Sequence, residues 1–235
     1  MPSSPLSSTT LARGRKRKNL LAVYERLLSA YGPQGWWPGA TPFEVIVGAI
    51  LTQRVAWSNV EQAIAALKEG GLLEPEALRR APLARVACLI RPSVYYNDKA
   101  RKLRSFLNFL HKRHGGSLDC LLSLSAECLR EELLSVQGIG EETADAIVLY
   151  AAGKPSFVVD AYTRRVLSRL GLAEEKARYG LLRALFMESL PRDPRLYNEY
   201  HALFVRHGKE RCRPRRPACS GCPLADLCSF PAEGG

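Results

Sequence analysis

Four cysteines near the C-terminus have a spacing that suits metal ligation. Cys212, Cys219, Cys222 and Cys228 form a C-x6-C-x2-C-x5-C pattern within CRPRRPACSGCPLADLC. A chain of 235 residues that is 46% hydrophobic can bury a core of its own, so we expect no disulfide scaffold. Structural zinc favours two close pairs, and only the middle pair has that interval. The spacing alone therefore leaves zinc and an iron–sulfur cluster as alternatives.

A second stretch, residues 133–171, combines a tight turn with a carboxylate. Gly138 and Gly140 flank Ile139, a spacing that lets the backbone turn and present bare N–H groups at the start of a helix. Such N–H groups bind phosphate without reading base sequence, although an ordinary turn between two helices is the alternative. Asp160 follows the apolar run SFVV and precedes a helical pattern, so we expect it to be a helix N-cap. A carboxylate held by helix amides stays ionised, which suits stabilisation of developing positive charge.

The charge of the chain points to a polyanionic partner. Its net charge is +11 and its pI is near 9.5. Basic residues cluster in residues 13–18 and again in residues 206–216. A solvated basic surface is the alternative, but the clustering favours nucleic acid.

The elements that position these residues are predicted to be helices. Apolar residues recur at helical spacing in residues 20–28, 43–51, 103–110 and 181–186, separated by Pro-, Gly- and Asn-rich breaks. Cys88, Cys120 and Cys128 lie in such helical segments, and we expect them to be buried core thiols.

The N-terminal segment is predicted to be a disordered basic tail. Residues 1–18 are rich in Ser, Thr and Pro, contain no acid and end in a basic run. An organelle transit peptide is the alternative reading of this composition. The sequence has no apolar run as long as the roughly 18 residues of a membrane span and no secretory signal. We expect a cytoplasmic, nucleoid-associated protein.

The Gly-Ile-Gly turn followed by Val-Val-Asp resembles the helix-hairpin-helix DNA glycosylases of the endonuclease III superfamily. This resemblance implies an all-α, two-lobed fold. The expected parts are a six-helix barrel domain at residues 40–153 and an iron–sulfur domain at residues 19–39 and 154–235, with DNA between them. Asp160 falls on the family's catalytic aspartate, which stabilises the oxocarbenium-like sugar as the bond to a flipped-out base breaks.

The same resemblance favours an iron–sulfur cluster over zinc at the four cysteines. The spacing and C-terminal position of the four cysteines match the [4Fe–4S] loop of endonuclease III-type glycosylases. The cluster would fold a loop that has few apolar residues of its own. It would also hold Arg213, Arg215 and Arg216 toward DNA phosphates.

One position implies that AP lyase activity, which cleaves the DNA backbone, is weak or absent. Bifunctional members of the superfamily carry a lysine two residues after the second glycine of the hairpin, where its amine forms a Schiff base with the sugar. Glu142 occupies that position here, and a carboxylate cannot form an imine. The nearest lysine, Lys154, lies in a turn beyond the hairpin helix.

The base pocket is predicted from a narrower resemblance. The segments GWWPGATPFEVIVGAILTQRVAWSNV and LIRPSVYYNDKARKL resemble the 3-methyladenine DNA glycosylases of the superfamily. The implied pocket residues are Trp36, Trp37, Pro38, Trp57, Glu142 and Lys209. Gln53 would fill the gap left by the flipped nucleotide, and Tyr95 would be a wedge. The alternative for Trp36 and Trp57 is that they are core aromatics.

These inferences predict a monofunctional base-excision DNA glycosylase that acts as a monomer on double-stranded DNA containing an alkylated purine such as 3-methyladenine. Such a base is cationic, and each indole face attracts a cation by roughly 0.5–2 kcal/mol. Two alternatives stay open. One is an endonuclease III-like glycosylase and lyase for oxidised pyrimidines or mismatched thymine. The other is a non-catalytic iron–sulfur DNA-binding protein in which Asp160 is only a helix cap.

Overall fold

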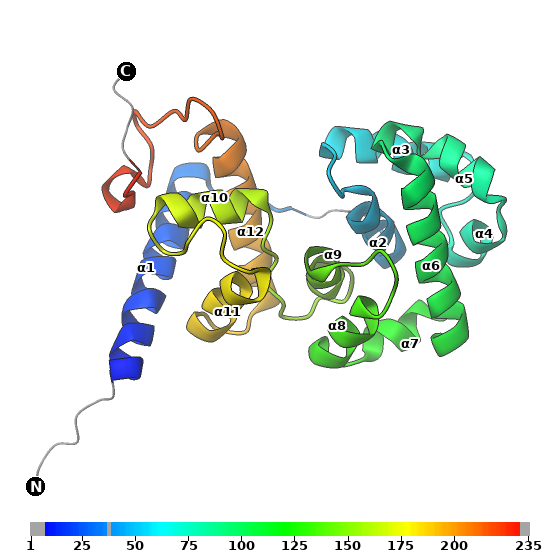
Figure 1. Cartoon of the computed structure of the whole chain (residues 1–235), viewed down its shortest axis with the longest axis horizontal. Coiled ribbons are helices and arrows are strands. Elements are labelled where there is room, and N and C mark those ends of the chain that lie inside the picture. The colour runs from blue at the N-terminus through cyan, green and yellow to red at the C-terminus, as the bar shows by residue number, and fades with distance from the viewer. Residues whose placement is uncertain (1–7, 37–38, 231–235) are drawn as a thin grey trace, which may run out of the picture. The chain divides into compact units, whose positions relative to one another are not determined.

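The regular elements of the described chain are all helices, as the sequence predicted (Figure 1). The computed structural model describes the backbone of residues 8–36 and 39–230, and the side chains of residues 19–36 and 39–230. Contacts divide the chain into a central unit, residues 37–156, and a terminal unit, residues 1–36 with 157–235. The family resemblance predicts the corresponding barrel domain at residues 40–153. None of the described helices is long and apolar enough to cross a membrane.

The central unit is built around helix α2, which is buried on nearly all sides. Thr41 begins α2 by accepting a hydrogen bond from the Glu44 amide, and Pro42 fits the first helical position, where no amide is needed. Ile46 and Ile50 are fully buried within α2. The elements of this unit are α2 (Pro42–Leu51), α3 (Trp57–Glu69), α4 (Pro75–Arg80), α5 (Leu83–Leu89), η1 (Arg91–Ser93), α6 (Tyr96–His114), α7 (Leu118–Ser123), α8 (Ala126–Leu134), α9 (Glu141–Ala146) and the π-helical turn η2 (Ile147–Ala151).

The terminal unit has an aromatic core. Phe157 stacks on Phe186 with ring centroids 3.7 Å apart, and Tyr200 packs edge-on against both rings. The Tyr200 hydroxyl donates a 2.7 Å hydrogen bond to the Leu20 carbonyl and so joins the last long helix to the first. The elements of this unit are α1 (Ser8–Tyr31), α10 (Ala161–Arg169), α11 (Tyr179–Ser189), α12 (Pro194–Glu210) and η3 (Ala225–Leu227).

Two expectations differ from the structure. Residues 8–18, expected to be disordered, form the first turns of α1. Their Leu, Ala, Arg and Lys residues are good helix formers, and the helix continues into a segment that buries Leu20. The prediction of buried thiols at Cys88, Cys120 and Cys128 is wrong, because all three are exposed. They lie on the outer faces of short helices whose neighbouring residues supply the core.

Phe186→Ala should lower the free energy of unfolding by about 3–5 kcal/mol, because it removes a fully buried ring from the aromatic core. Leu181→Ala is the matched control, since Leu181 lies on the same helix with 61% of its surface exposed. Urea unfolding of the intact protein measures both variants. Equal losses of stability would contradict the assignment of this core.

Candidate active site and cysteine loop

Asp160 begins α10 as its N-cap. Its Oδ1 accepts a 2.7 Å hydrogen bond from the Thr163 amide, and its side chain is 14% exposed. Its Oδ2 lies 3.5 Å from Nε2 of His201 on α12. Burial raises the pKa of Asp160, but the His201 charge and hydrogen bond, together with the Thr163 interactions, outweigh burial and leave the pKa below its usual value. Asp160 is therefore an ionised carboxylate held in a fixed orientation.

Trp36 packs on His201, the residue that contacts this carboxylate, within the terminal unit. Its indole stacks on the His201 ring with centroids 5.4 Å apart and planes 15° apart. Its carbonyl accepts a 3.2 Å hydrogen bond from the Asn198 side chain. The structure thus joins two residues that the sequence singled out, Trp36 and Asp160, through His201. Sequence reasoning missed His201, because nothing near it in the sequence marks it. Trp37 and Pro38 lie outside the described residues.

The turn between α8 and α9 depends on its two glycines. Gly138 has a φ of +94°, and a Cβ there would lie 2.3 Å from Cγ of Lys102, so a larger residue would be strained and would displace that side chain. Ile139 between the glycines is 5% exposed and anchors the turn in the core. Gly140 caps α9 without a side chain, and a Cβ there would meet no atom within 4 Å. This open backbone at a helix start is the geometry that a DNA phosphate needs.

Gln53 is tied to this turn. It lies in the loop after α2, and its amide nitrogen donates 3.1 Å hydrogen bonds to the Gly138 carbonyl and the Thr143 hydroxyl. Its amide oxygen accepts a 2.8 Å hydrogen bond from Lys102. Lys102 also pairs with Asp98 at 2.7 Å. The turn and the loop carrying Gln53 therefore form one hydrogen-bonded assembly, in which Lys102 is a member that the sequence did not indicate.

Two loops of the central unit contain non-glycine residues in the left-handed region. Arg54 has a φ of 58°, and the successive residues Val94 and Tyr95 have φ values of 56° and 48°. Such conformations cost about 1–3 kcal/mol each and persist only where the surroundings enforce them. Tyr95 is 62% exposed at the start of α6. Its ring is thus available at the surface, which the predicted wedge requires.

Lys99 joins these two loops from inside the central unit. Its ammonium, on a side chain with 1% exposure, donates a 2.8 Å hydrogen bond to the Leu51 carbonyl before the first loop and another to the Ser93 carbonyl before the second. The pKa of Lys99 is lowered to about 8, chiefly by burial and also by the charge of Lys102, while Asp98 opposes the shift. Lys99 therefore holds the backbone of both strained loops.

The other predicted pocket residues are spread over both units. Trp57 begins α3 and packs on α2, where a Cβ on Gly48 would lie 3.2 Å from its ring. Glu142 is exposed in the first turn of α9. Lys209 is exposed in the last turn of α12 in the terminal unit. Trp57 is half-buried and contacts the core, which agrees with the core-aromatic alternative, and its role in the base pocket stays a prediction.

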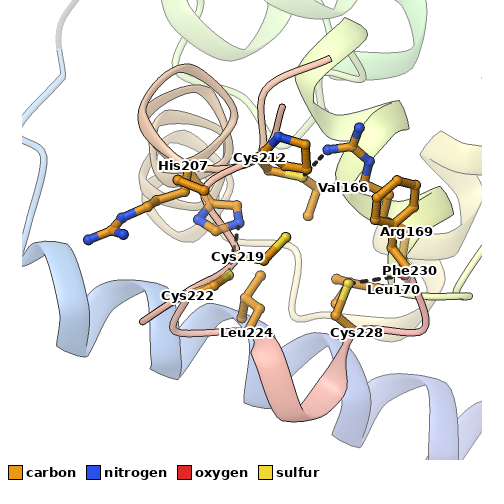
Figure 2. A pocket seen from close by; sticks show the side chains of 13 residues that line it. Val166, Arg169, Leu170, His207, Cys212, Cys219, Cys222, Leu224, Cys228 and Phe230 are labelled. Atoms are coloured by element: carbon orange, nitrogen blue, oxygen red, sulfur yellow. Dashed lines mark hydrogen bonds between the residues drawn. The ribbon is translucent and has the colours of Figure 1, made fainter. Parts of the chain in front are cut away.

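The four cysteines Cys212, Cys219, Cys222 and Cys228 line one cavity in the terminal unit (Figure 2). The same cavity is closed by apolar side chains of α10 and the loop, including Val166 and Leu224. Four thiols around a mostly apolar cavity are the donor set of an iron–sulfur cluster. When bound, the cluster supplies four metal–thiolate bonds that fix the fold of this loop.

Two arginines of α10 hold the cysteine loop in place. Arg165 donates to the carbonyls of Cys212 at 2.6 Å and Gly208 at 3.0 Å. Arg169 donates to the carbonyl of Arg213 at 2.8 Å, to that of Pro214 at 3.1 Å and to the Cys212 sulfur at 3.2 Å. The helix that begins at the candidate catalytic carboxylate therefore ends against the cysteines.

The basic residues between the cysteines face outward. Arg213, Arg215 and Arg216 are all exposed, and Arg216 has a φ of 50°. The loop thus presents three guanidinium groups at the surface while its backbone is held from α10. This is an arrangement that suits contact with a phosphate backbone.

Residues 47–192 match the HhH-GPD superfamily of base excision DNA repair proteins, and residues 212–228 match the iron–sulfur binding domain of endonuclease III. The chain belongs to the HhH-GPD superfamily. It is a base-excision DNA glycosylase with a [4Fe–4S] motif, and the predictions of family, fold and cofactor are confirmed. The four cysteines Cys212, Cys219, Cys222 and Cys228 are the residues of the matched segment that can hold the cluster.

Relatives and solved structures agree with this assignment. A protein of Methanocaldococcus jannaschii, named provisionally as a DNA repair glycosylase, is 44% identical over 91% of this chain and 97% of its own length. The solved non-covalent endonuclease III–DNA complex shares the fold, with a TM-score of 0.79 over 91% of this chain and 95% of its own, at 22% identity. The H. pylori 3-methyladenine DNA glycosylase bound to 1,N6-ethenoadenine has a TM-score of 0.68 at 29% identity, over 84% of this chain and 97% of its own.

Cys222→Ser should loosen the cysteine loop of this glycosylase, because the loop has few apolar contacts without its cluster. Trypsin should then cleave the Arg215–Arg216 bond, the arginine bond in the loop that does not precede proline, several times faster than in the wild type. Peptide mass spectrometry reports the cleavage rate. Cys128→Ser, an exposed cysteine outside the loop, is the control. Equal cleavage in both variants would contradict a cluster-dependent loop.

The effect of Lys99 on stability should depend on pH. Between pH 8 and about 10.4 the unfolded state keeps a proton on Lys99 that the folded state has lost, so stability rises with pH by up to about 1.4 kcal/mol per unit. Below pH 8 Lys99 is protonated in both the folded and the unfolded state, so the free energy of unfolding no longer changes with pH through this residue. The free energy of unfolding of the wild type minus that of Lys99→Met should therefore increase above pH 8 in urea titrations. Lys112→Met, an exposed lysine on the same helix, should show no such trend. Parallel trends for the two variants would refute the shift.

Proposed function

We propose that this glycosylase is monofunctional and excises a cationic alkylated purine of the 3-methyladenine kind from double-stranded DNA. The observation that carries the proposal is the stack of Trp36 on His201 beside the ionised Asp160. An indole face attracts a cationic base more than a neutral one, by roughly 0.5–2 kcal/mol. The H. pylori structure, a 3-methyladenine glycosylase at 29% identity, supports the same substrate class.

Asp160 supplies the chemistry that such a base requires. An alkylated purine is already a good leaving group, so no strong general acid is needed to release it. The bond to the sugar breaks with positive charge developing on the sugar, and a fixed carboxylate stabilises that charge. The Thr163 amide and His201 keep Asp160 in its ionised form, so the carboxylate needs no reorganisation during the reaction.

Two side chains support the absence of lyase activity. Glu142 stands where bifunctional members place their lysine, and its carboxylate cannot form a Schiff base. The amine of Lys154 donates hydrogen bonds to the carbonyls of Leu122 and Leu124. These bonds occupy two of its donors and hold the amine against the end of α7. Neither residue is positioned to act as an amine nucleophile.

The remaining predicted residues take the following roles in the proposal. Gln53 fills the gap left by the flipped nucleotide, Tyr95 is the wedge from the facing loop, and the Gly138–Gly140 turn binds a phosphate. Arg213, Arg215 and Arg216 contact the backbone of the DNA. For the base pocket, the proposal keeps the residues that the resemblance implies: Trp36, Trp37, Pro38, Trp57, Glu142 and Lys209.

The test is to incubate the cluster-loaded protein with duplexes that contain 3-methyladenine, an oxidised pyrimidine or a G·T mismatch, each with borohydride present. We expect release of 3-methyladenine and no protein–DNA adduct. Glu142→Lys is the matched variant, because it places an amine at the lyase position and should give a borohydride-trapped adduct.

Other outcomes identify the rival functions. Release of the oxidised pyrimidine or thymine in preference to 3-methyladenine would overturn the proposed substrate. A trapped adduct with the wild type would overturn the monofunctional assignment. No release from any duplex, with DNA binding retained, would favour a non-catalytic DNA-binding protein.

The acid limb of the excision rate should depend on His201. His201 lowers the pKa of Asp160, and the carboxylate is the active form, so wild-type activity should persist as pH falls from 8 to 5. His201→Gln removes that effect, so the pKa of Asp160 should rise, while the Thr163 interactions still oppose the effect of burial. The acid limb of the single-turnover rate should then move to higher pH. His111→Gln, an exposed histidine, is the control. Superimposable pH profiles for the two variants would contradict this role.

A further inference from the structure

Three side chains of the central unit form a series of thiol, imidazole and carboxylate that the glycosylase chemistry does not use. Cys120 in α7 has its Sγ 3.5 Å from Nδ1 of His114 at the end of α6. Nε2 of the same ring lies 2.6 Å from a carboxylate oxygen of Glu132 in α8. A nucleophile, a base and a group that orients the base therefore follow one another in hydrogen-bonding order.

The carboxylate decides which nitrogen of His114 carries the proton. Glu132 can only accept when ionised, so Nε2 of His114 is the protonated nitrogen that donates to it. Nδ1 then carries a lone pair and faces the thiol of Cys120. His114 is thus set to accept the proton of Cys120, and the charge that it gains is balanced by Glu132.

The imidazole is fixed and the thiol is accessible. The His114 side chain is 6% exposed, and Phe109 packs edge-on against it with ring centroids 5.7 Å apart. The Glu132 side chain is 24% exposed and has Arg113 at 3.7 Å from its other oxygen. Cys120 itself is exposed, and its amide is bound by the Ser117 hydroxyl at 3.1 Å. A buried, oriented base beside an accessible thiol is an arrangement that activates cysteine.

We infer that Cys120, His114 and Glu132 form a site of covalent modification that reacts with small alkylating electrophiles. None of the three residues belongs to the base pocket, the DNA contacts or the cluster loop. The inference is therefore independent of which damaged base the enzyme excises.

The chemical step is a simple displacement. The thiol proton of Cys120 passes to Nδ1 of His114, and the thiolate attacks the electrophilic carbon. The sulfur–carbon bond forms as the bond from carbon to the leaving group breaks, and the leaving group departs with the electron pair. The proton on His114 is then released to solvent, which restores the site apart from the thioether on Cys120.

The chain contains its own controls. Cys88 in α5 and Cys128 in α8 are also exposed, in the same unit. Among the described residues, neither has a histidine within hydrogen-bonding distance of its sulfur. They report the reactivity of ordinary surface thiols in the same molecule under the same conditions.

The experiment treats the full, cluster-loaded protein with a limiting amount of iodoacetamide at pH 7 and follows the three cysteines by peptide mass spectrometry. We expect Cys120 to be alkylated about tenfold faster than Cys88 and Cys128. His114→Gln should reduce the rate at Cys120 to that of the controls. Glu132→Gln, a smaller change, should reduce it in the same direction.

Two variants distinguish loss of the activating base from a folding defect. If His114→Gln alters the circular dichroism spectrum, the Glu132→Gln result decides, because that variant keeps the shape of the side chain. Equal alkylation of the three wild-type cysteines would overturn the inference. So would an unchanged rate at Cys120 in a folded His114→Gln or Glu132→Gln variant. Excision activity should be the same in all variants.

Discussion

The close crossing of α10 and α12 at Gly208 is the constraint on which the terminal unit depends. A Cβ at Gly208 would lie 2.5 Å from Cδ1 of Tyr162, so a larger residue would force the two helices apart. Because the helices cross this closely, Asp160 at the start of α10 reaches His201 of α12. Along the same helix, Arg165 reaches the Gly208 carbonyl and the cysteine loop. One steric requirement thus couples the candidate catalytic carboxylate to the iron–sulfur loop.

The helix cap and the proposed catalytic role of Asp160 both favour an ionised carboxylate. As an N-cap it stabilises α10, typically by about 1 kcal/mol, and the cap favours its ionised form. In the proposed reaction it must be ionised to stabilise the positive charge that develops on the sugar. The interactions with Thr163 and His201 outweigh the burial of the group, so structure and chemistry do not compete at this residue.

Features with local signals could be predicted from the sequence. The cysteine spacing, the Gly138 and Gly140 turn and the cap at Asp160 are each set by residues close together in the chain, and the helical periodicity indicates a mostly helical chain. Residues that act through contacts distant in sequence could not be found in this way. His201 meets Asp160 only because α10 and α12 pack together, and Lys99 meets Leu51 only because α6 crosses the end of α2.

The predictions that differ from the structure also concern features that local sequence does not determine. The prediction that the three surface cysteines are buried rests on their helical segments, yet the periodicity of short helices such as α7 does not determine which face is covered. For Cys120, that exposure is what makes a reaction with a soluble electrophile conceivable. The prediction of a disordered basic tail rests on composition alone, and composition does not show that α1 includes residues 8–18.

The catalytic role of Asp160 is tested most directly by the single-turnover excision of 3-methyladenine by Asp160→Asn. Asparagine caps a helix as well as aspartate does, so the variant should fold and bind an abasic-site duplex with an unchanged Kd. Excision should fall by about a thousandfold, because the stabilising charge is lost. Wild-type excision by a folded Asp160→Asn protein would show that Asp160 is only a helix cap.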